Sequence, residues 1–180
     1  SISISGTDRT LKLENECDPI DYSNLDADGH IVSPIFHEIS NDIFKKIKDD
    51  SNFLLVDSQG FLRQKDSKNN IILKKTDLDL SNVNAIKINP EEGQNIVSGS
   101  HDEMMLALQK KGIEYVLLTN KSDVSLLVKN RVYSLKLPNK HIHDTTGIGD
   151  IFCSAFTCTM LKEKDFLWAL CFAAGSAQAA

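Results

Sequence analysis

Strand-like and helix-like patterns of apolar residues alternate along the chain from about residue 40 onward. For example, the apolar run at 83–88 is followed by a helix start at Asn89 and a helical segment at 101–111, and the next apolar run begins at Tyr115. This alternation favours a mostly parallel sheet with helices on both faces, because each strand returns to the same end of the sheet through a helical crossover. The sequence therefore predicts an α/β fold, in which ligands bind at the carboxyl ends of the strands.

The individual elements are expected from apolar periodicity, capping residues and breakers. Strands are predicted at 31–36, 53–56, 71–73, 83–88, 115–118, 125–128 and 132–137, the last two as a hairpin around Asn130 and Arg131. Helices are predicted from Asn41 to about Asp50, from Asn89, and over 101–111, 149–163 and 165–180. Residues 1–17 alternate between apolar and polar positions, which favours a small lid of one or two strands beside the central sheet.

Composition and charge limit the possible partners. The 180 residues are enough for one domain with a sizeable core. The net charge is −5 and the 20 basic residues are spread along the chain, which argues against nucleic acid or an anionic membrane as a partner. The chain has no signal-peptide pattern and no apolar run near the ~20 residues of a membrane span, so a cytoplasmic location is predicted.

Two further features concern the cysteines and the ends of the chain. The four cysteines form no C-x-x-C pair, and we expect them to be reduced, buried and unable to build a zinc site. The chain opens on Ser1 rather than Met and stops in helical sequence at Ala180. We therefore expect an interior piece of a longer protein.

The segment 144–150, with the sequence D-T-T-G-I-G-D, carries the clearest chemical signal. It lies between a strand-like run and an apolar helical run, so Gly147 and Gly149 would leave backbone N–H groups uncovered at a helix start, where anions bind. Asp150 at the same helix start could accept a proton from an attacking alcohol, which indicates phosphoryl transfer. The alternative is an ordinary loop in which Asp150 is only a helix cap. The complete segment in its strand–turn–helix context favours the functional interpretation.

Several polar residues fall at predicted strand ends. They are Asp57, Asn89, Thr119 and Asp144, and their convergence supports a site at that edge of the sheet. Asn89 and Glu92 could hold hydrated magnesium and phosphate oxygens, although a plain helix cap is the simpler explanation of this pair taken alone. Arg63 could contact phosphate or lie in solvent.

Other chemistries have less support. His141 and His143 could begin a metal site, but two ligands are too few to predict one. The sequence contains no G-x-x-x-x-G-K-[ST] loop, no G-x-G-x-x-G, no G-x-S-x-G and no H-E-x-x-H. A kinase of this sequence would therefore lack the P-loop lysine.

Segment 144–150 resembles the D-T-T-G-A-G-D signature of the ribokinase (PfkB) family of sugar and nucleoside kinases, and the similarity continues through 151–156. Segment 89–92 resembles the N-x-x-E element of that family. Segments 33–38 and 57–63 are similar to its middle part, so the resemblance covers nearly the whole chain. It implies a ribokinase-like fold and a kinase that transfers the γ-phosphate of a nucleotide, with ATP the expected donor, to a hydroxyl of a sugar or nucleoside.

The resemblance also implies roles for individual residues. Asp150 would be the catalytic base, and the backbone of Gly147, Ile148 and Gly149 would form the anion hole. Asn89 and Glu92 would organise Mg²⁺ through water, together with phosphate. The nucleotide would be contacted by Thr119, Thr145, Thr146 and the helix around Ala174.

The resemblance further implies a domain organisation. Residues 1–17 would be part of a lid of strands, through which a homodimer could form. Residues 18–180 would be an α/β nucleotide-binding core that lacks the N-terminal part of the family domain. That missing part carries most acceptor contacts, so the sequence does not identify the acceptor.

The sequence departs from the family pattern at three positions. Lys121 and Val124 stand where the family usually has glycines, and Ala174 replaces an asparagine. Side chains at the first two positions would stand where backbone normally approaches the nucleotide. These departures keep open a second interpretation, a non-catalytic relative that binds a sugar or nucleotide without turning it over.

Overall fold

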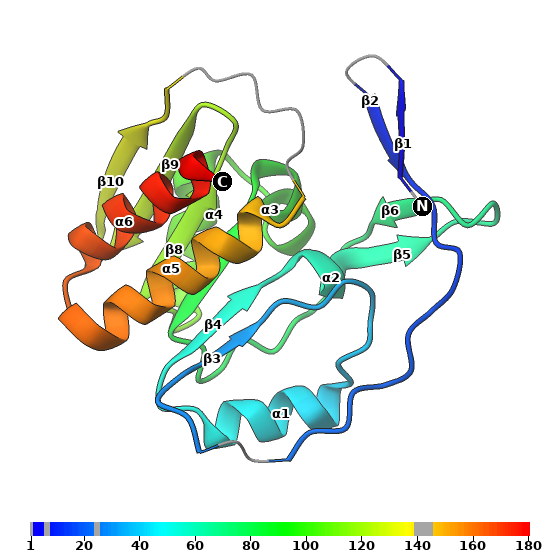
Figure 1. The fold of residues 1–180 in the computed structure, drawn as a ribbon, viewed down its shortest axis with the longest axis horizontal. Helices are drawn as coiled ribbons and strands as arrows, with labels where there is room; N and C mark the ends of the chain where they lie inside the picture. Colours follow the sequence, from blue (N-terminus) through cyan, green and yellow to red (C-terminus); the bar gives the residue numbers. More distant parts are fainter. Residues whose placement is uncertain (1, 6–7, 24–25, 139–145) are drawn as a thin grey trace.

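The computed structural model describes residues 2–5, 8–23, 26–138 and 146–180. Within these residues, a six-stranded sheet with the order β10-β9-β8-β7-β4-β3 forms the centre of the molecule (Figure 1). Its parallel strands are β3 (His30–Val32), β4 (Leu54–Asp57), β7 (Ala85–Ile88) and β8 (Tyr115–Thr119). Its antiparallel strands are β9 (Asp123–Val128) and β10 (Arg131–Lys136). The predicted mostly parallel α/β sheet is confirmed.

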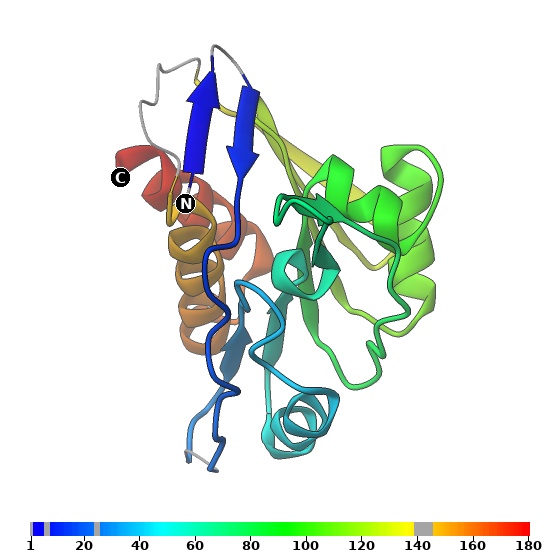
Figure 2. The same ribbon diagram turned by 90° about the vertical axis from the view of Figure 1, so that its right-hand side faces the viewer.

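Helices cover both faces of this sheet (Figure 2). One face carries α1 (Asn41–Asp50), the one-turn α2 (Gln59–Leu62), α3 (Pro90–Ile96) and α4 (His101–Lys110). The other face carries the two longest helices, α5 (Ile148–Glu163) and α6 (Phe166–Ala179). The order of strands and helices along the chain thus produces three layers, as the alternation in the sequence predicts.

Two apolar cores form because successive strand residues point to opposite faces of the sheet. In β4, Leu54 and Val56 pack on the side of α1, α3 and α4, whereas Leu55 packs on the side of α5 and α6. In β7, Ile86 takes the first side and Ala85 the second. A strand buried on both faces must be apolar at nearly every position, which explains the continuous apolar runs in the sequences of β4 and β7.

Two small antiparallel pairs lie outside the central sheet. They are β1 (Ile2–Ser5) with β2 (Asp8–Leu11), and β5 (Arg63–Lys65) with β6 (Ile71–Leu73). A bridge between Lys12 and Asn70 connects the two pairs, and β1–β2 stands apart from the body of the molecule (Figure 1). The strands expected in 1–17 are therefore present. Their role as a lid, and the division of the chain at residue 17, stay predictions.

Several local details differ from the sequence-based expectations. Ser40, not Asn41, caps α1, because its side chain accepts a hydrogen bond from the N–H of Ile43. The first strand of the central sheet ends before Ser33 and does not reach residue 36. The β9–β10 turn is formed by Lys129 and Asn130, both left-handed, so Arg131 already belongs to the strand.

The burial expected of the cysteines is wrong for three of the four. All four thiols are free within the described residues, but only Cys153 is buried, while Cys17, Cys158 and Cys171 are exposed. The last two lie on the outer faces of α5 and α6, where an apolar sequence does not guarantee cover. None of the helices in the described part of the chain is both long and apolar enough to cross a membrane.

Candidate active site

The carboxyl ends of the parallel strands meet at one edge of the sheet, and the N-terminus of α5 lies there too. Ser33 follows β3, Asp57 ends β4, Asn89 follows β7 and Thr119 ends β8. Asp57 and Lys87 are direct neighbours in the parallel register of β4 and β7. Parallel pairing therefore brings together polar residues that are far apart in the sequence.

The start of α5 is built to leave its backbone accessible. Gly147 is the N-cap residue, with a left-handed φ of 79° that glycine adopts without strain. No side chain among the described residues caps this helix, and a Cβ on Gly147 would meet no described atom within 4 Å. Ile148 and Gly149 then form the first turn. Free N–H groups and the helix dipole make such a turn a binding place for an anion.

Asp150 lies in the same first turn and is exposed. The Ser33 hydroxyl donates a hydrogen bond of 2.9 Å to its Oδ1 atom. Thr146, which precedes Gly147, is exposed in the turn. This carboxylate is accessible and held by one hydrogen bond, so it could accept a proton from a group bound beside the helix start.

A buried cluster of charges lies beneath this turn. Lys87 Nζ is 2.9 Å from Asp57 Oδ2 and 4.0 Å from Glu92 Oε2, and the three side chains are only 9%, 6% and 1% exposed. A Cβ on Gly149 would lie 3.7 Å from both Lys87 Nζ and Asp57 Oδ2, so the glycine rests directly against the ion pair.

The cluster perturbs the ionisation of its members. Burial disfavours the charged form of Lys87, but the neighbouring carboxylates of Asp57 and Glu92 outweigh this and raise the pKa of the lysine. Burial also raises the pKa of Glu92, with the charge of Asp57 acting in the same direction and Lys87 opposing it. Burial, together with the charge of Asp57, raises the pKa of the Cys153 thiol, which lies one turn further along α5. The thiol is therefore a packed side chain and not a nucleophile.

Asn89 and Glu92 form a complete capping box at the start of α3. The Glu92 N–H donates to Asn89 Oδ1 at 2.8 Å, and the Asn89 N–H donates to Glu92 Oε2 at 2.9 Å. The Asn89 amide also donates to Glu92 Oε1 at 2.6 Å. The simpler explanation of this pair, a helix cap, is confirmed.

This hydrogen bonding limits how the pair could serve magnesium. The Asn89 side-chain oxygen is committed to the cap, and Glu92 is buried, so direct coordination by both would dismantle the start of α3. Contact through water fits better, because Mg²⁺ usually keeps several waters and takes its other ligands from phosphate. Among the described residues, no group of three or more His, Cys, Asp or Glu side chains is placed to hold a metal ion.

Two of the positions predicted to contact a nucleotide, Thr119 and Ala174, lie in different surroundings. Thr119 is half-buried beside β7, and its hydroxyl donates to the Ile88 carbonyl at 3.4 Å, which places it near Asn89 at the same edge. Ala174 is buried on the sheet side of α6 and packs in the same core as Val124. Both stay predictions as nucleotide contacts.

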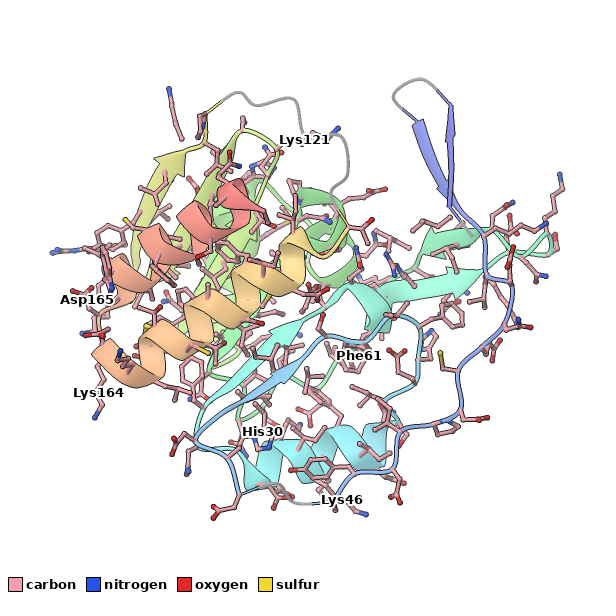
Figure 3. The ribbon with its side chains drawn as sticks, in the orientation of Figure 1. His30, Lys46, Phe61, Lys121, Lys164 and Asp165 are labelled. Carbon is pink, nitrogen blue, oxygen red and sulfur yellow. The ribbon has the colours of Figure 1, made fainter. Side chains whose placement is uncertain are left out.

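The two departures from the family glycines have structural explanations. Val124 is a core residue of β9, opposite Thr119, so its side chain fills the space between the sheet and α6. Lys121 is exposed at the outer end of the β8–β9 connection (Figure 3). The tight turn closes where the Asn120 N–H donates to the Asp123 carbonyl at 2.8 Å. Both residues thus belong to the short antiparallel hairpin of β8 and β9.

The remaining candidate residues are placed as follows. Arg63 donates to the Ile35 carbonyl at 3.1 Å, and its charge also acts on Glu92, so it lies at the margin of the cluster. His141, His143, Asp144 and Thr145 lie outside the described residues. Predictions that rest on them stay predictions.

Sequence reasoning did not assign a role to Lys87 or Ser33. Lys87 is the one charged residue in the strand segment Ala85–Ile88, an unusual position that could have identified it. Ser33 carries no comparable local signal, because its partner Asp150 is 117 residues away.

An open helix N-terminus and an oriented carboxylate thus lie at the carboxyl ends of the strands, where α/β proteins bind their ligands. Residues 47–180 match the pfkB family of carbohydrate kinases, and the chain belongs to this family. No curated protein matches the chain by sequence.

Solved structures of ribokinase-family kinases share the fold. One is a pyrophosphate-dependent kinase in the ribokinase family, solved as a sulfate complex. The match covers 97% of this chain and 65% of that kinase, with a TM-score of 0.83 and 21% identity. For ribokinase from Thermotoga maritima, the match covers 82% of this chain and 48% of the ribokinase, with a TM-score of 0.65 and 15% identity. For Arabidopsis thaliana ribokinase, solved with ribose and ATP, the match covers 82% of this chain and 47% of the ribokinase, with a TM-score of 0.59 and 20% identity. The chain thus spans less than two thirds of each of these kinases.

Proposed function

We propose that this chain carries the phosphoryl-transfer half of a kinase that moves the γ-phosphate of a nucleotide, with ATP the first candidate donor, to a hydroxyl of a sugar, polyol or nucleoside. The observation that supports this most is the pairing of an open glycine N-cap at Gly147 with Asp150 in the same helical turn. Family membership supports the reaction class.

The chemistry follows from the position of each group. The carboxylate of Asp150 accepts the proton of the acceptor hydroxyl as that oxygen attacks the phosphorus atom. The N–H groups of Gly147, Ile148 and Gly149 bind the charge on the transferred phosphoryl group, and their fixed orientation means that no reorganisation is needed during the reaction. The Ser33 hydroxyl keeps the base in one orientation.

Asn89 and Glu92 would hold Mg²⁺ through water. The ion, when bound, neutralises phosphate charge and orients the donor. The capping box would then keep the carboxylate of Glu92 in one orientation.

Structural relatives suggest the acceptor class. One pyrophosphate-dependent kinase was solved with a pyrophosphate analogue and myo-inositol, and another relative is an adenosine kinase solved with 2-fluoroadenosine. The myo-inositol and the 2-fluoroadenosine, like the ribose bound to the Arabidopsis enzyme, are small polyhydroxylated molecules. We propose the same class of acceptor for this chain.

Pyrophosphate is a second candidate donor, favoured by the packing beside β9. Val124 and Ala174 fill the core between β9 and α6, where the family resemblance would place nucleotide contacts. A donor without a base or ribose needs only the phosphate end of the site. The pyrophosphate-dependent kinase, with a TM-score of 0.83, is also more similar in fold than the two ribokinases, at 0.65 and 0.59.

The decisive experiment compares the full-length protein that contains this chain, the parent, with its Asp150→Asn variant. We expect the variant to fold and to bind ATP or pyrophosphate as the parent does, while turnover on a panel of sugars, polyols and nucleosides is lost. A variant that keeps more than about a tenth of the parent rate would show that Asp150 is not the base. Donor binding without turnover of any acceptor by the full-length protein would support the non-catalytic sensor instead.

The β1–β2 hairpin supports one proposal about assembly. An isolated two-stranded hairpin is only marginally stable in water, so a partner would stabilise it. We propose that it pairs with a second copy of the chain. Analytical ultracentrifugation of the parent and of a chain without residues 1–11 tests this, and a parent that stays monomeric at high concentration would contradict it.

A further inference from the structure

Lys87 is a buried lysine in a strand that is otherwise apolar. Its side chain is 9% exposed and points to the same side of the sheet as Ala85, toward α5. A lysine ammonium is costly to bury, so a position like this one is retained only where the charge has partners or a task.

Carboxylates outnumber the ammonium of Lys87 in this cluster. Asp57 and Glu92 both act on it, which places two buried carboxylates around one buried cation. A third carboxylate, that of Asp150, lies in the helical turn above them. An excess of negative charge would repel a phosphate that approached this turn, unless the ammonium offset it.

The ammonium lies against the turn that would bind the anion. A Cβ on Gly149 would be 3.7 Å from Lys87 Nζ, an ordinary van der Waals distance. An oxygen that accepts from an N–H group lies about 2.9 Å from the nitrogen. The long lysine side chain therefore needs only a small displacement to reach a phosphate oxygen held by the backbone of this turn.

We propose that Lys87 is a side-chain ligand of the phosphate bound at Gly147, Ile148 and Gly149, and that its ammonium shares that phosphate with Asp57. This inference rests on the proposed function, because it assumes a phosphate at the start of α5. It assigns to a strand residue the charge that the lysine of a P-loop supplies in other kinases.

A purely structural role is the alternative. Lys87 could serve only to neutralise Asp57, in which case removing both charges should leave phosphate binding intact. The double variant Asp57→Asn/Lys87→Met tests this directly, because it removes both charges of the 2.9 Å pair together. Glu92 loses the cation 4.0 Å away but keeps its hydrogen bonds to Asn89. Lys87→Arg retains the cation, although a guanidinium fits the same space less well.

Isothermal titration calorimetry with inorganic pyrophosphate, on the 180-residue chain, is the measurement. We expect the double variant to melt cooperatively and to bind pyrophosphate at least about tenfold more weakly than the parent. We expect Lys87→Arg to bind more tightly than the double variant. The control is Lys48→Met/Asp79→Asn, a second buried lysine with an exposed carboxylate partner on the α1 side of the sheet, which should bind as the parent does.

The outcomes separate the two claims. A folded double variant that binds within about threefold of the parent would overturn the role of Lys87 alone. A parent that binds neither pyrophosphate nor ATP would overturn the phosphate site itself, and the inference with it. Equal weakening in the Lys48 control would show that the loss of a buried lysine elsewhere in the protein also disturbs the site, and would overturn the inference.

Discussion

The hydroxyl of Ser33 donates to the carboxylate of Asp150 at 2.9 Å, across 117 residues of sequence. Ser33 follows β3 at the edge of the sheet, and Asp150 lies in the first turn of α5. One hydrogen bond therefore connects the outermost parallel strand to the proposed catalytic base. Its effect is to choose one orientation of an otherwise exposed side chain.

Ser33→Ala should lower turnover more than stability. The lost hydrogen bond is exposed, so we expect the free energy of unfolding to change by less than about 1 kcal/mol. A base with several orientations is less often in the productive one, and we expect kcat to fall roughly tenfold. Steady-state kinetics and chemical denaturation measure the two effects.

Ser40→Ala is the control for that variant. Ser40 caps α1 through the N–H of Ile43 and lies away from the site. Its loss should reduce stability by about 1 kcal/mol while kcat stays at the parent value. If Ser33→Ala and Ser40→Ala show the same pattern, the orienting role of Ser33 is wrong.

Asn89→Ala separates the capping role of this residue from its role in the site. We expect a loss of about 1 kcal/mol, because the capping box of α3 is broken. Ser100→Ala breaks an equivalent box with Glu103 at the start of α4 and should lose a similar amount. Only Asn89→Ala should raise the Mg²⁺ concentration needed for half-maximal turnover. An equal effect of both variants on the Mg²⁺ dependence would refute the metal role.

Gly60→Ala should be strongly destabilising. A Cβ at this position would lie 2.0 Å from the Pro34 carbonyl oxygen, so either α2 or the segment after β3 must move. We expect a loss of roughly 3 kcal/mol in thermal or chemical unfolding. Gly175→Ala in α6 is the matched control, because its Cβ would meet no described atom within 4 Å. That variant should gain roughly 0.5–1 kcal/mol from helix propensity.

Tyr115 should make the protein sensitive to alkaline pH. Burial beside Phe53, Phe156 and Phe166 raises the pKa of Tyr115 to about 12, above the ordinary value of about 10. Between these two values the unfolded chain loses this proton and the folded chain keeps it, so stability falls as the pH rises. Tyr115→Phe should show a smaller fall over this range, measured by urea unfolding. The difference in tyrosinate absorbance between the parent and the Tyr115→Phe variant should rise near pH 12. A rise near pH 10 would contradict the raised pKa of Tyr115.

Local sequence signals predicted most of the elements. The Asn89 cap, the glycine turn before α5 and the apolar strand runs all depend on residues close together in the sequence, and the structure confirms them. The errors are local as well. The shift of the β9–β10 turn by one residue reflects the left-handed conformation of Lys129, which its residue type does not indicate.

The burial of the cysteines failed as a prediction for a different reason. The sequences of α5 and α6 are apolar on nearly all sides, so periodicity does not show which face meets the sheet. Packing against Leu55 and Leu117 selects one face and leaves Cys158 and Cys171 outside.

By itself the sequence determined the α/β class, the open helix start at Gly147 and the carboxylate of Asp150 beside it, because each depends on apolar patterning and short-range backbone geometry. Only the tertiary structure decided that Lys87 meets Asp57 and that Ser33 meets Asp150. Those contacts follow from strand order and register, which are fixed by packing between residues far apart in the chain.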